Sequence, residues 1–294
     1  MTANKFKRKG SSSAIPAPSS ASNRRTRPGV QDAARLVALA PISNCIDSWM
    51  VASSNYEAML MAKGGARLAE LDRRREDLAF TAATWTNMTK DQLLNIIIEW
   101  KFLKGKPRHA LKPLLHSNTE AAVIAASKLA FAAARAIPTR DEENRSTEND
   151  DIKKHNQGDN SEIRKRQIIS AINHLCELKG VGPATASAVL CLIRPDAFAF
   201  MDDEVIECLL PNKKRGYTLG IYMEVNDRCY EIAEQLNMTT RNKRRRKTNV
   251  DEQEVSVSSS EVWTPCQVGK ALWACATMSA TNDVDGLSAI FKIE

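Results

Sequence analysis

The sequence predicts an all-α protein, and three observations support this prediction. Apolar residues recur at helical spacing over most of the chain between residues 32 and 290. No stretch shows the sustained alternation of apolar and polar residues, bounded by tight turns, that is typical of half-buried strands. Apolar residues make up 43% of the 294 residues, which is enough to bury a sizeable core. We therefore expect one helical domain over residues 32–290, and a monomer.

Start and stop signals divide this domain into successive helices. Alanine- and leucine-rich periodicity predicts a first helical block within residues 32–80. Thr89 and Gln92 form a capping box that predicts the start of the next helix, which Gly105 and Pro107 end. The apolar face of that helix consists of Leu93, Leu94, Ile97, Ile98 and Trp100.

Later segments follow the same logic. Ser117 with Glu120 predicts the start of a helix that ends at Pro138. The acidic, polar stretch 139–161 is expected to be an insertion, and Ser161 to open the helix after it. Further helices are expected at 183–193, 203–210, 218–237 and 265–279, with a basic, Ser-rich insertion at 241–260.

The net charge of +7 is unevenly distributed, because residues 1–31 contain seven basic residues and no acidic one. This tail is rich in Ser, Ala, Pro and Arg and lacks apolar periodicity, so we expect it to be disordered. Its basic clusters at 7–9 and 24–25 resemble a divided signal for a nuclear import receptor, although a mitochondrial or plastid transit peptide has a similar composition. The second basic run, at 241–247, makes the nucleus the favoured location.

Missing patterns exclude several functional classes. No window approaches about 18 uninterrupted apolar residues, so no contact with a membrane is expected. There is no P-loop, no dinucleotide-binding glycine pattern and no nucleophile elbow. The seven Cys form no CxxC pair and the four His show no metal-binding spacing, so we expect no cofactor and no metal. The cysteines are interpreted as small core residues in a reducing compartment.

The segment LCELKGVGPATASAVL, at 175–190, carries the most specific signal. Leu178 ends one helix on its buried side, Gly180 and Gly182 allow a tight turn, and Pro183 suits the first position of the next helix. The exposed amides of such a turn, with the adjacent helix N-terminus, would bind a phosphate. A simple packing turn between two helices would use the same residues. The predicted contacts to a nucleic-acid backbone are Lys179, Gly180, Val181, Gly182, Ala184 and Thr185.

This segment matches the helix-hairpin-helix element of DNA-binding proteins, which the expected helix-hairpin-helix at 171–191 would form. Beyond it, AFAFMDDEVIECL places Asp202 at the expected start of a helix. Together the two segments resemble the helix-hairpin-helix superfamily of DNA glycosylases, which has the endonuclease III-like fold, over about residues 165–210. The block EWKFLKGKPRHALKPL also looks like one found in a poorly characterised eukaryotic branch. The resemblance implies DNA as the partner, base-excision repair as the process and Asp202 as the catalytic residue.

The chemistry of such an acid is to stabilise the positive charge that develops on the sugar as the base leaves. In the lyase branch of the superfamily a Lys stands second after the second hairpin glycine, where this chain has Ala184. The resemblance therefore implies a glycosylase without lyase activity. The alternatives are a non-catalytic DNA-binding module or a helical interaction scaffold, with Asp202 as an ordinary N-cap. Asp203 and Glu204 would repel phosphates unless cations such as Lys179 or Arg194 offset them.

Two weaker candidates remain. A basic stretch interleaved with Trp100 and Phe102 could follow a DNA backbone, or it could be a solvated helix end with Trp100 in the core. Trp85 and Trp263 could line a base pocket, although large aromatic residues at helix starts are more often packing anchors. The basic stretch consists of Lys101, Lys104, Lys106, Arg108, His109 and Lys112.

Overall fold

The computed structural model describes residues 46–80, 85–139, 153–248 and 262–280. All the regular elements in these ranges are helical, so the all-α prediction is confirmed for this part of the chain. None of these helices is long and apolar enough to cross a bilayer. The predicted disordered tail at 1–31 and its import signals lie outside the described residues.

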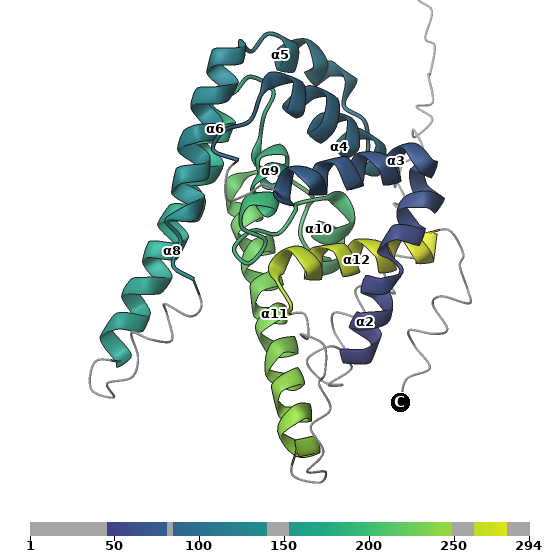
Figure 1. The fold of residues 1–294 in the computed structure, drawn as a ribbon, viewed down its shortest axis with the longest axis vertical. Coiled ribbons are helices and arrows are strands. Elements are labelled where there is room, and N and C mark those ends of the chain that lie inside the picture. Colours follow the sequence, from purple (N-terminus) through teal and green to yellow (C-terminus); the bar gives the residue numbers. More distant parts are fainter. Residues whose placement is uncertain (1–45, 81–84, 140–152, 249–261, 281–294) are drawn as a thin grey trace, which may run out of the picture.

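Twelve helical segments are described, and Figure 1 shows their arrangement. In chain order they are α2 (Ile46–Ser54), α3 (Tyr56–Phe80), the π-helical η1 (Gln92–Ile98), α4 (Glu99–Lys104), the short 3₁₀ turn η2 (His109–Leu111), α5 (Lys112–His116), α6 (Glu120–Arg135), α8 (Lys153–Cys176), α9 (Pro183–Ile193), α10 (Asp203–Leu209), α11 (Leu219–Thr248) and α12 (Pro265–Ala280).

Helix α9 lies at the centre of the fold and contacts α3, α6, α8, α11 and η1. Every residue from Ala184 to Ile193 is buried, as expected for a helix that is apolar on all sides. Ala186 and Ala188 are small enough for the neighbouring helices to approach closely. A second contact centre is α12, which packs against α2, α3, α10 and α11.

The capping box before η1 is confirmed. The Thr89 amide donates to Gln92 Oε1 at 2.9 Å, and the Gln92 amide donates to Thr89 Oγ1 at 3.2 Å. The predicted apolar face is also confirmed, since Leu93, Ile97 and Trp100 are each at most 1% exposed.

The predicted start of α6 was wrong by two residues. Thr119 is the N-cap and accepts a hydrogen bond from the Ala122 amide at 3.2 Å. Ser117 instead donates its hydroxyl to the Leu114 carbonyl at 2.8 Å, because it ends the preceding turn of α5.

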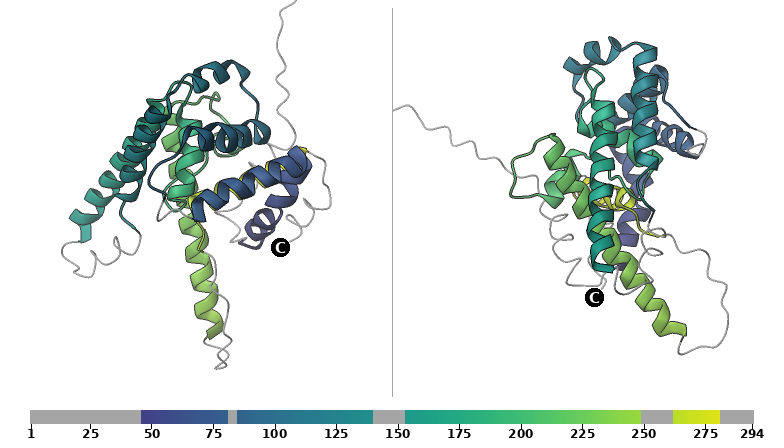
Figure 2. Two further views of the ribbon diagram at one scale, coloured as in Figure 1. Left: turned by 45° about the horizontal axis from the view of Figure 1, so that its top comes forward. Right: turned by 90° about the vertical axis from the view of Figure 1, so that its left-hand side faces the viewer.

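The two predicted insertions are partly helical. Helix α8 begins at Lys153 and not at Ser161, and α11 continues to Thr248 through much of the basic run. Both extra segments lie at helix ends that extend beyond the central cluster (Figures 1 and 2). Lys and Arg are good helix formers, and Arg241 and Lys243 are exposed, so a polar run of this kind can prolong a helix. The rest of both insertions, at 140–152 and 249–260, lies outside the described residues.

The turn from α8 to α9 requires a glycine at position 180 but not at position 182. Gly180 has a φ of 77°, and a Cβ there would lie 3.1 Å from Leu115 Cγ. Gly182 has a φ of −122°, and a Cβ there would meet nothing within 4 Å. The expectation that both glycines are needed for a tight turn is therefore wrong for Gly182.

We predict that Gly180→Ala lowers the free energy of unfolding by about 1–3 kcal/mol, because it forces a left-handed backbone on a residue with a Cβ. Gly182→Ala is the matched control and should change it by less than about 0.5 kcal/mol. Urea unfolding followed by circular dichroism measures both. Equal losses in the two variants would contradict this account of the turn.

Candidate functional site

The backbone amides of the α8–α9 turn fall into two groups. The Lys179 amide donates to Asn118 Oδ1 at 2.9 Å, and the Val181 amide donates to the Leu178 carbonyl at 3.1 Å. These two predicted phosphate donors are therefore occupied by the protein itself. The Lys179 side chain is exposed and remains available to an anion.

The other amides of the turn are open. Within the described residues, the amides of Gly180, Gly182 and Ala184 make no hydrogen bond. The last two stand at the start of α9, where the helix dipole is positive. Because nothing lies within 4 Å of a Cβ position at Gly182, a ligand atom can approach this backbone closely. The side chains of Val181 and Thr185 are buried and hold the turn in place.

Asn118 clamps the turn from the neighbouring α5–α6 connection. Its side chain accepts from the Lys179 amide and donates to the Lys179 carbonyl, both at 2.9 Å. Its amide nitrogen also lies 3.0 Å from the Leu115 carbonyl, and the residue is 6% exposed. No local sequence pattern predicts this role, because the two partners are 61 residues apart.

Asp202 is the N-cap of α10, which confirms the structural interpretation of this residue. Its Oδ1 accepts from the Val205 amide at 2.9 Å. Its Oδ2 accepts from Lys104 Nζ at 2.8 Å, and both side chains are almost completely buried. The two carboxylate oxygens are thus held in one orientation by partners from different parts of the chain.

Lys104 is a buried cation. It therefore does not belong to a DNA-facing stretch, which was one of the two interpretations of its sequence context. Burial lowers its pKa, against the opposing effect of the Asp202 carboxylate. Nζ lies 3.9 Å from the ring centre of Trp273 and 5.1 Å from that of Phe200. Trp100 and Tyr56 complete this aromatic surrounding. The rings and the carboxylate together replace the water that the ammonium group loses.

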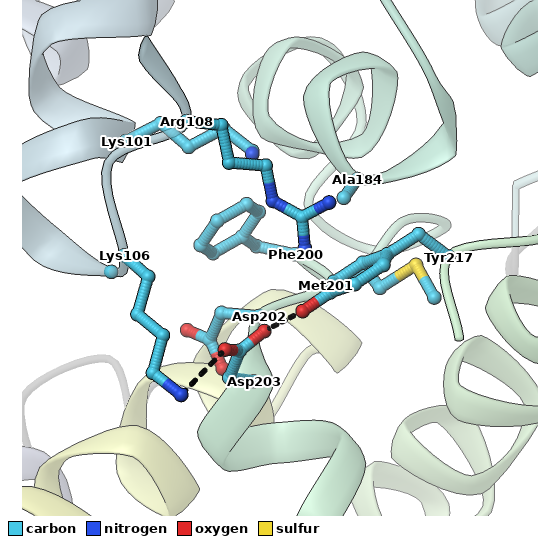
Figure 3. Close-up of a pocket in the computed structure, with 10 residues that line it drawn as sticks. Lys101, Lys106, Arg108, Ala184, Phe200, Met201, Asp202, Asp203 and Tyr217 are labelled. Carbon is cyan, nitrogen blue, oxygen red and sulfur yellow. Dashed lines mark hydrogen bonds and ion pairs between the residues drawn. The ribbon is translucent and has the colours of Figure 1, made fainter. Parts of the chain in front are cut away.

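Asp202 also reaches a pocket, which Figure 3 shows. The pocket measures about 30 Å³, which is room for a water molecule but not for a nucleobase. Asp202 and Ala184 both line it, so the acid and the first turn of α9 face the same space. Its remaining wall consists of Lys101, Gly105, Lys106, Arg108, Phe200, Met201, Asp203 and Tyr217.

Three cations surround this pocket. Arg108 stacks on Tyr217, with its guanidinium carbon 4.0 Å from the ring centre, and so covers one side (Figure 3). Lys106 Nζ lies 3.9 Å from Asp203 Oδ2. Burial lowers the pKa of Lys101, and the positive charge of Arg108 lowers it further. The predicted basic stretch thus contributes three cations here, although its Lys104 is buried.

The acidic residues after Asp202 are neutralised locally. Asp203 accepts from Arg215 at 2.9 Å and from the Tyr217 hydroxyl. Glu204 lies 3.9 Å from Lys63, and burial followed by the repulsion of Asp202 raises its pKa.

Lys179 and Arg194, the cations that the sequence suggested for this role, do not pair with Asp203 or Glu204. Arg194 forms a two-point ion pair with Asp196, at 2.8 Å for each contact, and Lys179 is exposed on the turn. Since Lys63, Lys106 and Arg215 are the actual partners, the expected crowding does not leave a free negative patch.

The remaining candidates serve packing. Trp85 is buried against Phe131, with ring centres 5.0 Å apart. Trp263 packs on Trp49 and lines a separate cavity of about 120 Å³ between α8, α11 and the start of α12. Among the residues that the structure describes, no three His, Cys, Asp or Glu side chains are grouped to hold a metal ion.

No family model, curated protein or solved structure matches this chain. The resemblance to helix-hairpin-helix glycosylases therefore rests on the residues of the turn and of the Asp202 segment.

We predict strong coupling between Lys104 and Asp202. Lys104→Met should lower the free energy of unfolding by about 3–5 kcal/mol, because it leaves a buried carboxylate without its cation. Adding Asp202→Asn should restore part of this loss, since the amide oxygen still caps α10 and no charge remains buried. Chemical denaturation of the two single variants and the double variant measures the coupling.

The exposed Arg67–Glu99 pair, also 2.8 Å long, is the matched control for this experiment. Arg67→Met should cost less than about 1 kcal/mol, because solvent screens that pair. If the effects at Lys104 and Asp202 add without coupling, the buried ion pair does not have the role described.

Proposed function

We propose that this protein binds the sugar-phosphate backbone of DNA through the α8–α9 turn. The observation that carries the proposal is the set of free amides at Gly180, Gly182 and Ala184, beside the N-terminus of α9. Backbone amides at a helix N-terminus favour a phosphate by hydrogen bonding and by the helix dipole. Contacts of this kind hold a nucleic acid without reading its sequence.

The charge around the turn supports the same proposal. Lys179 is exposed on the turn, and Lys101, Lys106 and Arg108 surround the pocket that Ala184 lines. A phosphate on the turn amides would leave the next phosphates of the strand near these cations. Import to the nucleus through the basic clusters at 7–9 and 24–25 would bring the protein to this ligand.

A glycine-to-glutamate comparison tests DNA binding. Gly182→Glu should weaken binding to a duplex at least about tenfold, because a carboxylate would occupy the phosphate position. Gly220→Glu is the matched control, since this exposed glycine at the start of α11 also has nothing within 4 Å of its Cβ position. It adds the same charge elsewhere and should change the affinity less than about twofold. Fluorescence anisotropy over a range of salt concentrations measures both affinities.

Circular dichroism and unfolding curves must show that both variants are folded. Equal affinity of the wild type and Gly182→Glu would refute the proposed contact. A wild type that does not bind DNA at low salt but forms a stable protein complex would favour a helical interaction scaffold.

The second candidate function is excision of a damaged or mispaired base, without a lyase step. Asp202 and Ala184 share one pocket, so a strand held on the turn would lie near the acid. A carboxylate there would stabilise the positively charged sugar as the base leaves. Excision requires the pocket to widen, because about 30 Å³ does not hold a base, and Arg108 on Tyr217 is the side chain that would have to move.

A panel of duplexes that contain uracil, alkylated or oxidised bases tests this reaction. The wild type should release one base class and leave an abasic site that is cleaved only after alkali treatment. Asp202→Asn should lower the rate at least about a hundredfold while keeping DNA affinity. Because it leaves the buried Lys104 without its carboxylate, circular dichroism must show that the variant is folded at the assay temperature. Asp227→Asn, at an exposed acid on α11, is the control and should keep full activity.

Absence of abasic product on every duplex, or equal product from Asp202→Asn, would exclude catalysis by Asp202. If DNA binding persists in that case, the protein is a non-catalytic DNA-binding module.

A further inference from the structure

The cavity of about 120 Å³ lies between α8 and α11, which diverge in Figure 1, and the start of α12. Arg194, Asp196 and Ala197 also line it, and they follow the C-terminal end of α9. The cavity is therefore separate from the turn at the other end of that helix, and the proposed contact with DNA does not use it. Val262 lines it and is 57% exposed, which gives a ligand a route from solvent.

Most of the cavity wall is apolar. Trp263 lines it and is held by Asn237, which hydrogen-bonds to the Trp263 amide at 2.8 Å and to the Trp263 carbonyl at 2.9 Å. Ala197 and Ala233 are almost completely buried, and their small side chains leave the space open. A water molecule needs about two to four polar partners, so water in this space would leave many hydrogen bonds unmade. The wall therefore favours a ligand with an apolar body.

The ionised groups in the wall differ in whether the protein pairs them. Arg194 and Asp196 form a two-point ion pair with each other, at 2.8 Å for each contact. Glu234 also has an interaction partner. Arg164 of α8 stacks on Tyr230 of α11, with its guanidinium carbon 3.6 Å from the ring centre. Within the described residues, however, Arg164 Nη2 is buried without a hydrogen-bond partner.

A guanidinium nitrogen without a partner beside an apolar space costs free energy, which a ligand with an acceptor would recover. Arg75, Glu204 and Trp273 also carry a buried atom without a partner, but none of them lines either of the two cavities described above. A guanidinium group binds a carboxylate by charge and by parallel N–H donors. Stacking on Tyr230 limits the motion of Arg164, so less side-chain freedom is lost when an acceptor binds.

We propose that this cavity binds a small monocarboxylate with a short aliphatic body. The carboxylate accepts hydrogen bonds from Arg164, and the aliphatic body lies against Trp263 and Ala233. An apolar cavity of about 150 Å³ takes benzene, so a cavity of about 120 Å³ suits an acid of about six heavy atoms, such as isobutyrate. The same chemistry has two sources, a free acid and the C-terminal carboxylate of a polypeptide.

Titration of the isotope-labelled full-length protein with isobutyrate, followed by two-dimensional NMR, tests the site. The indole N–H signal of Trp263, assigned by its loss in Trp263→Phe, should shift and give a saturable binding curve. The signal of Trp273, which is fully buried beside Lys104, should move little. Isobutyramide has nearly the same shape without the charge and should bind at least about tenfold more weakly.

Two variants separate the role of the charge from that of the cavity. Arg164→Gln removes the cation and should weaken isobutyrate binding at least about tenfold. Ala233→Leu keeps Arg164 but fills the space, and it should abolish saturable binding. Arg166→Gln removes an exposed charge from the same helix and is the matched control, which should change the affinity less than about twofold. Thermal unfolding must show that the variants are folded, and if Ala233→Leu is not, the comparison of Arg164→Gln with Arg166→Gln decides.

A second pair of probes distinguishes the two sources of the carboxylate. Glycylalanine carries the skeleton of isobutyrate with the peptide N–H in place of one methyl group, and glycylalaninamide lacks its charge. If glycylalanine binds at least about tenfold more tightly than isobutyrate and the amide does not bind, the ligand is a polypeptide C-terminus. Equal or weaker binding of glycylalanine assigns the cavity to a free acid.

Three results would overturn the proposal. One is the absence of saturable binding by isobutyrate and glycylalanine, which would mean that water alone completes Arg164. Another is equal affinity for isobutyrate and isobutyramide. The third is unchanged affinity in a folded Arg164→Gln variant.

Discussion

The buried ion pair between Lys104 and Asp202 is the interaction on which the rest of the candidate site depends. Two desolvated charges are stable only when each compensates the other and nearby groups hydrogen-bond to their remaining donors and acceptors. Here the carboxylate also caps α10, and the ammonium group is surrounded by aromatic rings, including Trp273 of α12. The pair therefore joins the end of α4 to the start of α10 and fixes one wall of the pocket. An acid in such a position is both a structural element and a possible reactant.

Helix α9 connects the α8–α9 turn to the centre of the fold. Because all of its sides are covered, its two ends have defined positions relative to the rest of the core. At its N-terminus the Asn118 side chain hydrogen-bonds to both the amide and the carbonyl of Lys179. The amides of Gly182 and Ala184 keep no internal hydrogen-bond partner. Near its C-terminus Cys191 lies 3.7 Å from the guanidinium group of Arg75. The same packing thus places amides without an internal partner at one end and a buried thiol beside a buried cation at the other.

DNA binding and base excision make different demands on this arrangement. Binding needs only the amides that lack an internal partner and the nearby cations, and it requires no change in the contacts of Asp202. Excision needs Asp202 to act on a sugar, while both of its oxygens have partners and the adjacent pocket has room for little more than water. Base excision thus depends on a local rearrangement that backbone binding does not need. This difference makes backbone binding the function that the geometry supports best.

Much of the local structure followed from the sequence, because it depends on neighbours within a few residues. The all-α class, the Thr89–Gln92 capping box, the bounds of α9 and the N-cap at Asp202 are of this kind. The ends of α8 and α11 were missed, since polar residues can extend a solvent-facing helix as well as form a loop. Only the tertiary structure decided that Lys104 faces Asp202, 98 residues away, and that Asn118 binds the backbone of Lys179, 61 residues away. Local sequence patterns do not indicate which distant side chain compensates a buried charge, because that pairing depends on how the helices pack.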